Sequence, residues 1–281
     1  MTRGQGRIRD MLGAIIGDIV GSRFEWHNIK TKEFDFFSPE CFFTDDSVMT
    51  IALAEAILAS GGQYGDLGRL AVGSMRALGI KYGDRGYGGM FKRWLASSDP
   101  KPYHSFGNGA AMRVSPCGFA AKTLEEAVLL SRLVTEVTHD HPEGIKGAEA
   151  TAAGIFLART GHGLAAIRDH LSRNYYPLDF TLDSIRSGYA FNETCQETVP
   201  QAIEAFLESS GFEDAIRGAI SIGGDSDTLA AITGGLAEAF YGLPDDLARQ
   251  GLDFLDPPLA RIVDDFRAAY PRAAQRPPAS D

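Results

Sequence analysis

The chain has 281 residues, enough for one large domain or two small ones with a sizeable core. Its composition, 44% hydrophobic and 23% charged, is that of an ordinary globular protein. The formal net charge of −10 argues against a general nucleic-acid-binding surface, which needs an excess of basic residues. It does not exclude an anionic ligand, because backbone N–H groups bind phosphate without a net positive charge.

The cysteines and the hydropathy pattern bear on location. Cys41, Cys117 and Cys195 show no Cys-X-X-Cys spacing, so we interpret them as free thiols in a reducing compartment. No run approaches the roughly 18 unbroken apolar residues of a membrane span. The N-terminus has arginines but no apolar segment followed by a cleavage site. We therefore expect a cytoplasmic protein that does not bind a membrane.

In the first part of the chain, apolar residues recur mostly with helical spacing, and strand-like alternation is scarce. Residues 11–20 are an apolar segment whose small residues permit close packing. An irregular aromatic connector, residues 24–43, follows, and we expect it to cover the surface or to border a pocket. A strong helical pattern then begins at Ser47 and ends at Gly61 and Gly62.

In the middle of the chain we expect a weaker helix over residues 67–78 and a short helix over residues 90–95. The glycine-rich residues between them, 82–89, predict a mobile loop. Thr123 and Glu126 fit a capping box at the start of a further helix.

In the last part of the chain, Pro142 suits the first turn of a helix, and Thr198 with Gln201 fits a second capping box. No repeat and no linker divides the chain. We therefore predict an all-α fold, with a single compact multi-helix domain over residues 1–270 and a flexible tail over residues 271–281. The helices expected here span residues 142–160, 164–171, 198–207, 213–220, 229–241 and 259–269.

Two acidic clusters, residues 44–47 and 221–228, each precede a predicted helix. The positive end of a helix helps to keep carboxylates ionised. Their carboxylates and threonine hydroxyls form an all-oxygen set, which suits Mg²⁺, Mn²⁺ or Ca²⁺ rather than zinc. Four carboxylates exceed what one Mg²⁺ usually takes from a protein, so a two-metal site is reasonable. The candidate ligands are Thr44, Asp45, Asp46, Asp225, Asp227 and Thr228.

Helix capping is the competing interpretation of these clusters, since Asp, Ser and Thr are favoured N-cap residues. Two such clusters in one chain make capping alone a weaker explanation. Gly223 and Gly224 also precede the second cluster, and glycine allows a backbone to approach a ligand closely.

Two other stretches could bind a ligand. Small residues at Gly107, Asn108, Gly109 and Ala110 would present successive amides to a phosphate, although a plain turn explains them equally well. His139 and His141 have a spacing seen in zinc sites. No further histidine or cysteine lies at a fitting distance, which favours ligand contact or capping of a helix C-terminus.

In combination, five short motifs in one order resemble the ADP-ribosylglycohydrolase family, which includes the dinitrogenase reductase activating glycohydrolases. The resemblance implies an all-α fold with a cleft holding two metal ions, Mg²⁺ or Mn²⁺. It also implies an ADP-ribosylated protein or a small ADP-ribosyl compound as substrate, with arginine, serine or another group as the linkage. The motifs are residues 13–22, 44–47, 106–113, 138–139 and 223–228.

The resemblance also implies roles for individual residues. The six candidate ligands above would hold the metals, and residues 107–110 would hold the diphosphate of ADP-ribose. His139 would line the ribose or phosphate side. Residues 82–89 resemble the adenosine-side loop, which makes Tyr87 and Gly88 candidate substrate contacts. Glu25 falls where some members place a mobile acidic residue near the metals.

The implied reaction cleaves the glycosidic bond at the ribose C1″ carbon, through a transition state that carboxylates stabilise. A metal-bound water would attack, positioned by Asp46 or Asp227, between which the sequence does not choose. Two alternatives remain: a catalytically silent relative that binds ADP-ribose or has a structural role, and a metal-dependent hydrolase of another nucleotide or glycoside. The sequence leaves the oligomeric state open.

Overall fold

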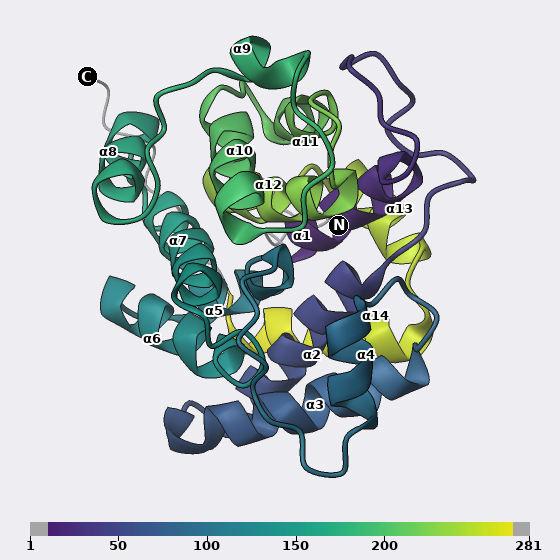
Figure 1. Ribbon diagram of the computed structural model, residues 1–281, viewed down its shortest axis with the longest axis vertical. Helices are drawn as coiled ribbons and strands as arrows, with labels where there is room; N and C mark the ends of the chain where they lie inside the picture. The colour runs from purple at the N-terminus through teal and green to yellow at the C-terminus, as the bar shows by residue number, and fades with distance from the viewer. Residues whose placement is uncertain (1–10, 272–281) are drawn as a thin grey trace, which may run out of the picture.

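The computed structural model describes residues 11–271, which form one compact all-helical body (Figure 1), as predicted. No β-strand occurs in this part of the chain; one isolated bridge joins Gly107 and Thr194. Residues 1–10 of the predicted domain and residues 272–281 of the predicted tail lie outside the described residues. The α-helices are α1 (Leu12–Gly21), α2 (Asp45–Ser60), α3 (Leu67–Lys81), α4 (Gly89–Ala96), α5 (Ser115–Ala120), α6 (Leu124–Thr135), α7 (Pro142–Arg159), α8 (Leu164–Asn174), α9 (Leu182–Arg186), α10 (Cys195–Leu207), α11 (Phe212–Ile220), α12 (Ser226–Tyr241), α13 (Asp245–Asp253) and α14 (Pro257–Ala269).

Helices α1 and α12 pack at the centre of the fold, backbone against backbone. A Cβ atom on Gly17 would lie 2.0 Å from the carbonyl oxygen of Ala230, and one on Gly234 would lie 2.1 Å from that of Gly13. Side chains are therefore excluded from this seam, and the small residues of the first apolar segment explain the close approach. The seam fixes the start of α12 beside the end of α1.

The N-terminus of α1 is capped from across the same seam. The carboxylate of Glu238, buried in α12, accepts hydrogen bonds from the backbone N–H groups of Leu12 (3.3 Å) and Gly13 (2.6 Å). The first N–H groups of a helix lack partners within that helix, so this long-range contact satisfies two of them. It also adds a polar restraint to the glycine packing.

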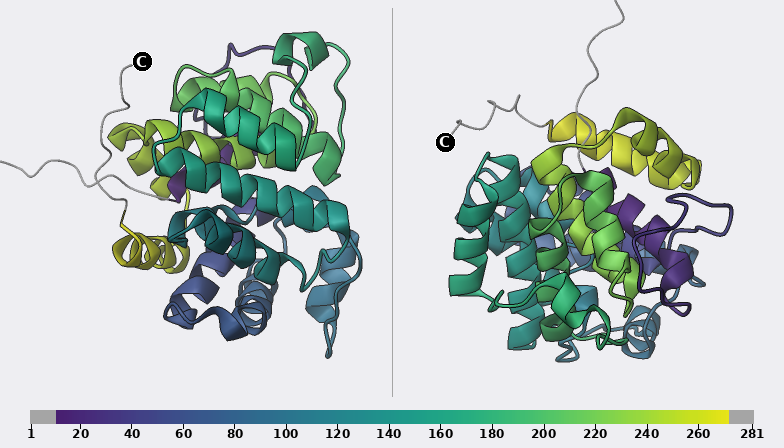
Figure 2. Two further views of the ribbon diagram at one scale, coloured as in Figure 1. Left: turned by 90° about the vertical axis from the view of Figure 1, so that its left-hand side faces the viewer. Right: turned by 90° about the horizontal axis from the view of Figure 1, so that it is seen from above.

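The other helices surround this pair in two groups (Figures 1 and 2). Helices α7, α10 and α11 pack against α12, and α6 and α8 pack against α7. Helices α3 and α14 pack against α2, which itself contacts α1, and α5 packs against both α7 and α2. The first acidic cluster therefore begins a helix of the second group and the other begins α12 of the central pair, and α1 contacts both helices.

Several local predictions differ from the structure. Helix α10 begins at Cys195, so Thr198 and Gln201 lie inside it and form no capping box. Thr123 does cap α6, but the Glu126 side chain bonds the N–H of Lys122 rather than that of Thr123. Helices α5, α9 and α13 were not predicted, because each is short and presents few apolar residues in a helical repeat.

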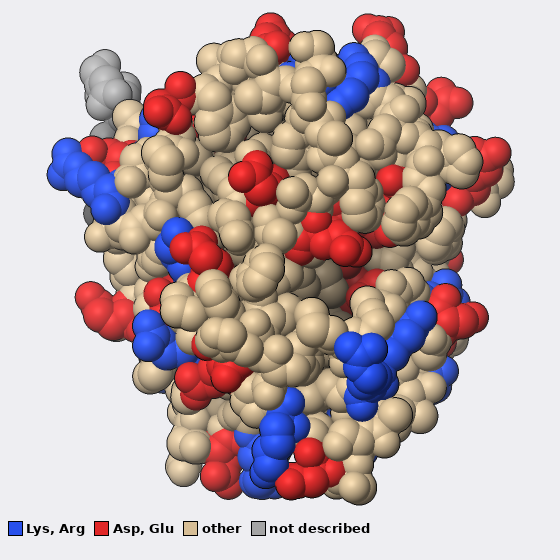
Figure 3. All heavy atoms as spheres, in the orientation of Figure 1, with Lys and Arg blue, Asp and Glu red and all other residues tan. Residues whose placement is uncertain are grey.

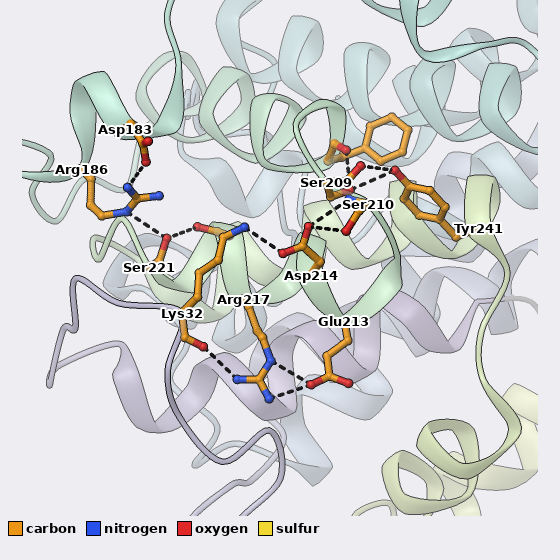
Figure 4. Close-up of polar contacts among 12 residues, drawn as sticks. Lys32, Asp183, Arg186, Ser209, Ser210, Glu213, Asp214, Arg217, Ser221 and Tyr241 are labelled. Atoms are coloured by element: carbon orange, nitrogen blue, oxygen red, sulfur yellow. Dashed lines mark hydrogen bonds and ion pairs between the residues drawn. The ribbon is translucent and has the colours of Figure 1, made fainter.

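The predicted irregular connector is fastened to the α11 side of the molecule. The ammonium of Lys32 pairs with Asp214 at 2.8 Å, and the guanidinium of Arg217 donates to the carbonyls of Lys32 (2.9 Å) and Phe34 (2.6 Å). Figure 4 shows these side chains reaching from α11 to the connector, with Arg186 contacting Ser221 beside them. The connector therefore has a defined course without regular structure.

The structure confirms that the three cysteines are free, and all are buried. Among residues 11–271, none of the helices combines the length and the apolar character that a membrane crossing requires.

The seam predicts a strong effect of one added methyl group. Gly17→Ala places Cβ against backbone atoms that cannot move independently, so we expect the free energy of unfolding to fall by about 2 kcal/mol or more. Gly73→Ala is the matched control, because nothing lies within 4 Å of its Cβ position in α3, and it should stabilise the protein by up to about 1 kcal/mol. Urea denaturation measures both. Equal stability of the two variants would contradict the close seam.

Candidate active site

A cavity of about 390 Å³ opens between the two helix groups. This volume is in the range of sites for small molecules and cofactors. Figure 3 shows acidic side chains gathered beside a hollow on this face of the molecule. The cavity is lined by these predicted site residues: Glu25, Asp45, Asp46, Gly88, Gly107, Asn108, Gly109, His139, Asp225, Asp227 and Thr228.

Three predicted site residues do not line the cavity. The Tyr87 ring is buried against Phe91, with ring centroids 5.5 Å apart, and the glycines on either side of Tyr87 line the cavity in its place. Ala110 is buried behind the loop. The Thr44 hydroxyl donates to Asp18 and accepts the N–H of Asp46, which leaves one acceptor position on that oxygen.

Asp18, which the sequence analysis did not single out, joins the first acidic cluster to α1. Its carboxylate is fully buried and accepts the N–H (2.9 Å) and hydroxyl (2.7 Å) of Thr44, and the N–H (3.1 Å) and hydroxyl of Ser47. The start of α2 is thus attached to the middle of α1. The available signal was a single carboxylate within an otherwise apolar helix, where an unpaired charge would be costly.

The second acidic cluster meets the connector at this point. Glu25, Asp225 and Asp227 each offer a carboxylate oxygen, and these oxygens lie within 4.8 Å of one another. Two further observations suit a cation: Asp46 Oδ2 and Asp227 Oδ1 are buried and have no hydrogen-bond partner among the described residues. Buried carboxylate oxygens without partners are costly, and a hard divalent ion would satisfy them.

The hydrogen bonds show which residues of the acidic clusters cap a helix and which are left for a ligand. Thr44 does cap α2, through its bond to Asp46 N–H. Asp225 occupies the N-cap position of α12 but makes no capping hydrogen bond. Its Oδ2 atom instead accepts the side-chain amide of Asn108 at 2.7 Å. Capping therefore accounts for Thr44 and does not account for Asp225 or Asp227.

Burial and crowding raise the pKa of every carboxyl group in this cluster. Burial, opposed by bonds from Ser47 and Thr44, raises the pKa of Asp18 to about 6. Burial, with Asp227 and Asp18 nearby, raises the pKa of Glu25 to about 8 and those of Asp45 and Asp46 well above the usual range. Such groups oppose one another as anions unless a cation neutralises them.

The Gly107–Ala110 loop differs from the predicted row of free amides. The N–H groups of Gly107, Asn108 and Ala110 donate to Ser105 Oγ (3.1 Å), Glu193 O (2.8 Å) and Gly107 O (3.1 Å). Those three amides are engaged within the chain and are not free for a phosphate. Gly107, Asn108 and Gly109 still form a cavity wall, and their part in substrate binding stays a prediction.

His139 faces this glycine wall in a defined protonation state. Arg113 Nη2 lies 3.2 Å from His139 Nδ1, and because arginine only donates, Nδ1 accepts. Burial and the nearby guanidinium lower the pKa of His139 well below its usual value, so the neutral ring carries its proton on Nε2. A Cβ on Gly109 would lie 3.4 Å from Nε2. His139 thus presents a hydrogen-bond donor beside the wall.

His141, predicted to contact ligand or to cap a helix C-terminus, instead caps the N-terminus of α7, where its Nδ1 accepts the N–H of Glu143 at 3.1 Å. The predicted mobile loop, residues 82–89, is anchored: the Tyr82 hydroxyl bonds Asp256 at 2.6 Å, and Arg85 O accepts the N–H of Asp45 at 2.8 Å.

Asn28 and Lys30 clamp the connector to the second acidic loop. The Asn28 side-chain amide donates to the carbonyls of Phe24 (2.7 Å) and Glu25 (3.0 Å), and exchanges hydrogen bonds with both the N–H and the carbonyl of Gly224 (2.8 Å each). Lys30 donates to the carbonyls of Tyr189 and Ile222. Glu25 and Asp225 are therefore held in one polar unit.

Comparison with known proteins identifies the family. The profile described as ADP-ribosylglycohydrolase matches residues 3–276. The chain belongs to the ADP-ribosylglycohydrolase family. Among its relatives are the human (Homo sapiens) ADP-ribosylhydrolase ARH3, 27% identical over 86% of this chain and 87% of that protein, and the Rhodospirillum rubrum ADP-ribosyl-(dinitrogen reductase) glycohydrolase, 26% identical over 78% and 76%. A structure titled ADP-ribosylglycohydrolase-related protein complex shares the fold, with a TM-score of 0.64, 24% identity and coverage of 92% of this chain and 96% of that one.

The raised carboxyl pKa values predict a pH-dependent stability of the metal-free protein. Asp18 and Glu25 titrate near 6 and 8 in the fold, above their ordinary 3.8 and 4.5. A carboxyl group whose pKa is raised by folding stabilises the folded state at low pH. This contribution is lost as the pH rises through the pKa that the group has in the folded protein. We expect the protein in chelator to melt at a lower temperature at about pH 8 than at about pH 5, with a smaller difference in Asp227→Asn. A melting temperature independent of pH would contradict the buried cluster.

The clamp predicts faster opening of the second acidic loop in Asn28→Ala. The Gly224 N–H loses its acceptor in this variant, so its hydrogen exchange should accelerate about tenfold or more, the effect of about 1.4 kcal/mol. Asn174→Ala, which removes a similar side-chain bond to His170 at the end of α8, is the control and should leave Gly224 unchanged. Equal exchange at Gly224 in both variants would show that Asn28 is not the clamp.

Proposed function

We propose that this family member hydrolyses the glycosidic bond between ADP-ribose and a modified side chain, with arginine as the favoured linkage, and that hydrolysis depends on two Mg²⁺ or Mn²⁺ ions. One observation carries the proposal: carboxylates from two loops far apart in the chain converge, with unpartnered oxygens, on a cavity of about 390 Å³. The names of the relatives, which are ADP-ribosyl hydrolases, support the same reaction.

The chain supplies the cation-binding oxygens from three directions. The α2 start offers Asp45 and Asp46, the α12 start offers Asp225, Asp227 and Thr228, and the connector offers Glu25. Thr44 is an additional predicted ligand through its remaining acceptor position. When bound, the metals supply a water of lowered pKa and fix the ribose hydroxyls.

The other residues of the site bind and orient the substrate. The Nε2 atom of His139 is placed to donate to a substrate oxygen that lies against the glycine wall, which is the predicted diphosphate side. Asp46 and Asp227 are the candidates for directing the attacking water, because each has a buried oxygen without a partner. Their charge also stabilises the developing positive charge at the ribose C1″ carbon.

An acidic cavity mouth supports a cationic leaving group. Glu25 and Glu193 line the cavity near the carboxylate cluster. Glu193 also contributes to the raised pKa values of Glu25 and Asp225, so its charge acts on the reacting region. A guanidinium leaving group is favoured there by simple attraction, whereas a serine hydroxyl gains nothing from it.

The test is release of ADP-ribose from defined ADP-ribosyl-arginine, ADP-ribosyl-serine and nucleobase substrates in Mg²⁺, Mn²⁺ or chelator. We expect release that requires a metal and is fastest from arginine. Asp46→Asn and Asp225→Asn should lower kcat at least about a hundredfold, as expected when a group that stabilises charge in the transition state is removed. Asp179→Asn, at an exposed acid far from the cluster in sequence, is the control.

Three results would overturn the proposal. Full activity of both cluster variants in chelator would exclude the metal centre. Tight ADP-ribose binding with no release from any substrate would identify a catalytically silent member, and release only from other nucleotides or glycosides would identify a different hydrolase. Calorimetric titration with ADP-ribose and with each metal separates these outcomes.

A cytoplasmic location stays a prediction.

A further inference from the structure

Exposed aromatic side chains gather at one edge of the cavity. Trp26 is 71% exposed, Phe106 43% and Phe191 36%. The rings of Trp26 and Phe191 stack with centroids 4.9 Å apart and planes at 23°. We name Trp26, Phe106 and Phe191 the aromatic rim. Large apolar side chains left in water beside a cavity are typical of an interaction surface.

Backbone and side-chain contacts attach this rim to the cavity wall. Trp26 directly follows Glu25, which lines the cavity, and the Trp26 side chain lowers the pKa of that carboxyl group against the larger effect of burial. Phe106 directly precedes Gly107, and its carbonyl accepts the N–H of Cys195 at 2.9 Å. Phe191 lies two residues before Glu193, whose carbonyl accepts the N–H of Asn108 at 2.8 Å. Trp26 and Phe191, whose rings stack, thus adjoin cavity-lining residues, and Phe106 adjoins the glycine wall with its ring against that of His141, 5.2 Å between centroids.

The charges around the cavity are separated. Glu25 and Glu193 lie on the rim side, whereas Arg93 and Arg113 line other parts of the wall. None of the ion pairs in the described part of the chain involves Glu25 or Glu193. The aromatic rim therefore lies beside the negative charge of Glu193, an exposed cavity-lining residue that none of these ion pairs includes. Such a surface complements an apolar or basic partner segment and repels an acidic one.

The position of the rim relative to the carboxylates decides which part of a substrate reaches it. The carboxylate cluster marks the bond to be cleaved, if the proposed function holds. Beyond that bond lies the modified polypeptide, and Glu25 connects the cluster directly to Trp26. Trp26, Phe106 and Phe191 are not among the residues that line the cavity, so we assign ADP-ribose to the cavity and the polypeptide to the rim.

We propose that the aromatic rim, with Glu193, is a docking surface for the polypeptide that carries the ADP-ribose, and that it favours segments with apolar and basic residues beside the modified one. This inference rests on the proposed function for its substrate. The docking surface goes beyond the proposed function because it separates recognition of the protein from recognition of ADP-ribose. The enzyme would accordingly act better on a modified peptide than on the free modified amino acid.

Kinetics with two substrates test the docking surface. Phe191→Ala should lower kcat/KM about tenfold for an ADP-ribosylated peptide with leucine and lysine next to the modified arginine, as loss of an aromatic contact at an interface does. The same variant should change kcat/KM less than about twofold for free ADP-ribosyl-arginine. Ile80→Ala, at a 64% exposed residue of α3, is the matched control and should change neither value. Equal losses on both substrates would make Phe191 part of the cavity wall and overturn the inference.

A comparison of peptides with different flanking charges is a second, independent test of the docking surface. Wild-type protein should prefer peptides with flanking lysines over those with flanking glutamates. Glu193→Gln should reduce that preference about threefold, because the carboxylate charge beside the rim is removed. A preference that is absent in the wild type, or unchanged in this variant, would contradict the acidic character of the docking surface.

A binding measurement keeps the two proposals separable. Fluorescence anisotropy of a labelled, unmodified peptide containing arginine, leucine and lysine reports on docking without hydrolysis. Weaker binding by Phe191→Ala than by Ile80→Ala supports the rim even if no substrate is hydrolysed, a result that would reject the proposed function alone. Peptide binding that is absent, or equal in the two variants, rejects the rim whatever the hydrolysis assays give.

Discussion

The hydrogen bonds of one buried carboxylate, Asp18, organise the site. Asp18 holds the start of α2 against the middle of α1, and the glycine seam holds α12 against the other side of the same helix. Helix α1 is thus a shared support for two acidic loops that lie about 180 residues apart in the sequence. A change that separated α1 from either partner would move the carboxylates apart without touching any of them.

This arrangement of buried carboxyl groups is electrostatically unfavourable. Several carboxyl groups are withdrawn from water within one small region; burial raises the pKa of Asp46 and Asp227, and neighbouring carboxylates raise it further. Amides offset part of the cost, since Asn108 donates to Asp225 and the N–H groups of Thr44 and Ser47 donate to Asp18. Two buried oxygens without partners remain, on Asp46 and Asp227, which line the cavity. Stability and function therefore oppose each other at this point, as is common where charged groups are held for catalysis.

The sequence predicted the helical fold because apolar residues repeat with helical spacing, and it predicted the acidic clusters because their composition is unusual. It could not show what joins them: Asp18 is one polar residue inside an apolar helix, and its partners are determined only by packing. The direction of the Tyr87 ring was equally out of reach, since glycines predict a loop but contact with Phe91 decides where the ring lies. Three of the amides expected to be free in residues 107–110 are engaged within the chain: nearby Ser105 Oγ accepts that of Gly107, the carbonyl of distant Glu193 accepts that of Asn108, and Gly107 O accepts that of Ala110.

The clamp formed by Asn28 and Lys30 has a consequence for how the family can diversify. Asn28 holds the main chain of Gly224 and Lys30 holds that of Ile222, so the clamp acts on backbone atoms and not on the side chains of the acidic residues. The exposed residues beside it, such as Trp26, can be exchanged while the backbone positions of Glu25 and Asp225 are kept. Exchange of exposed side chains at this edge of the cavity should therefore change its surface without moving the carboxylate cluster.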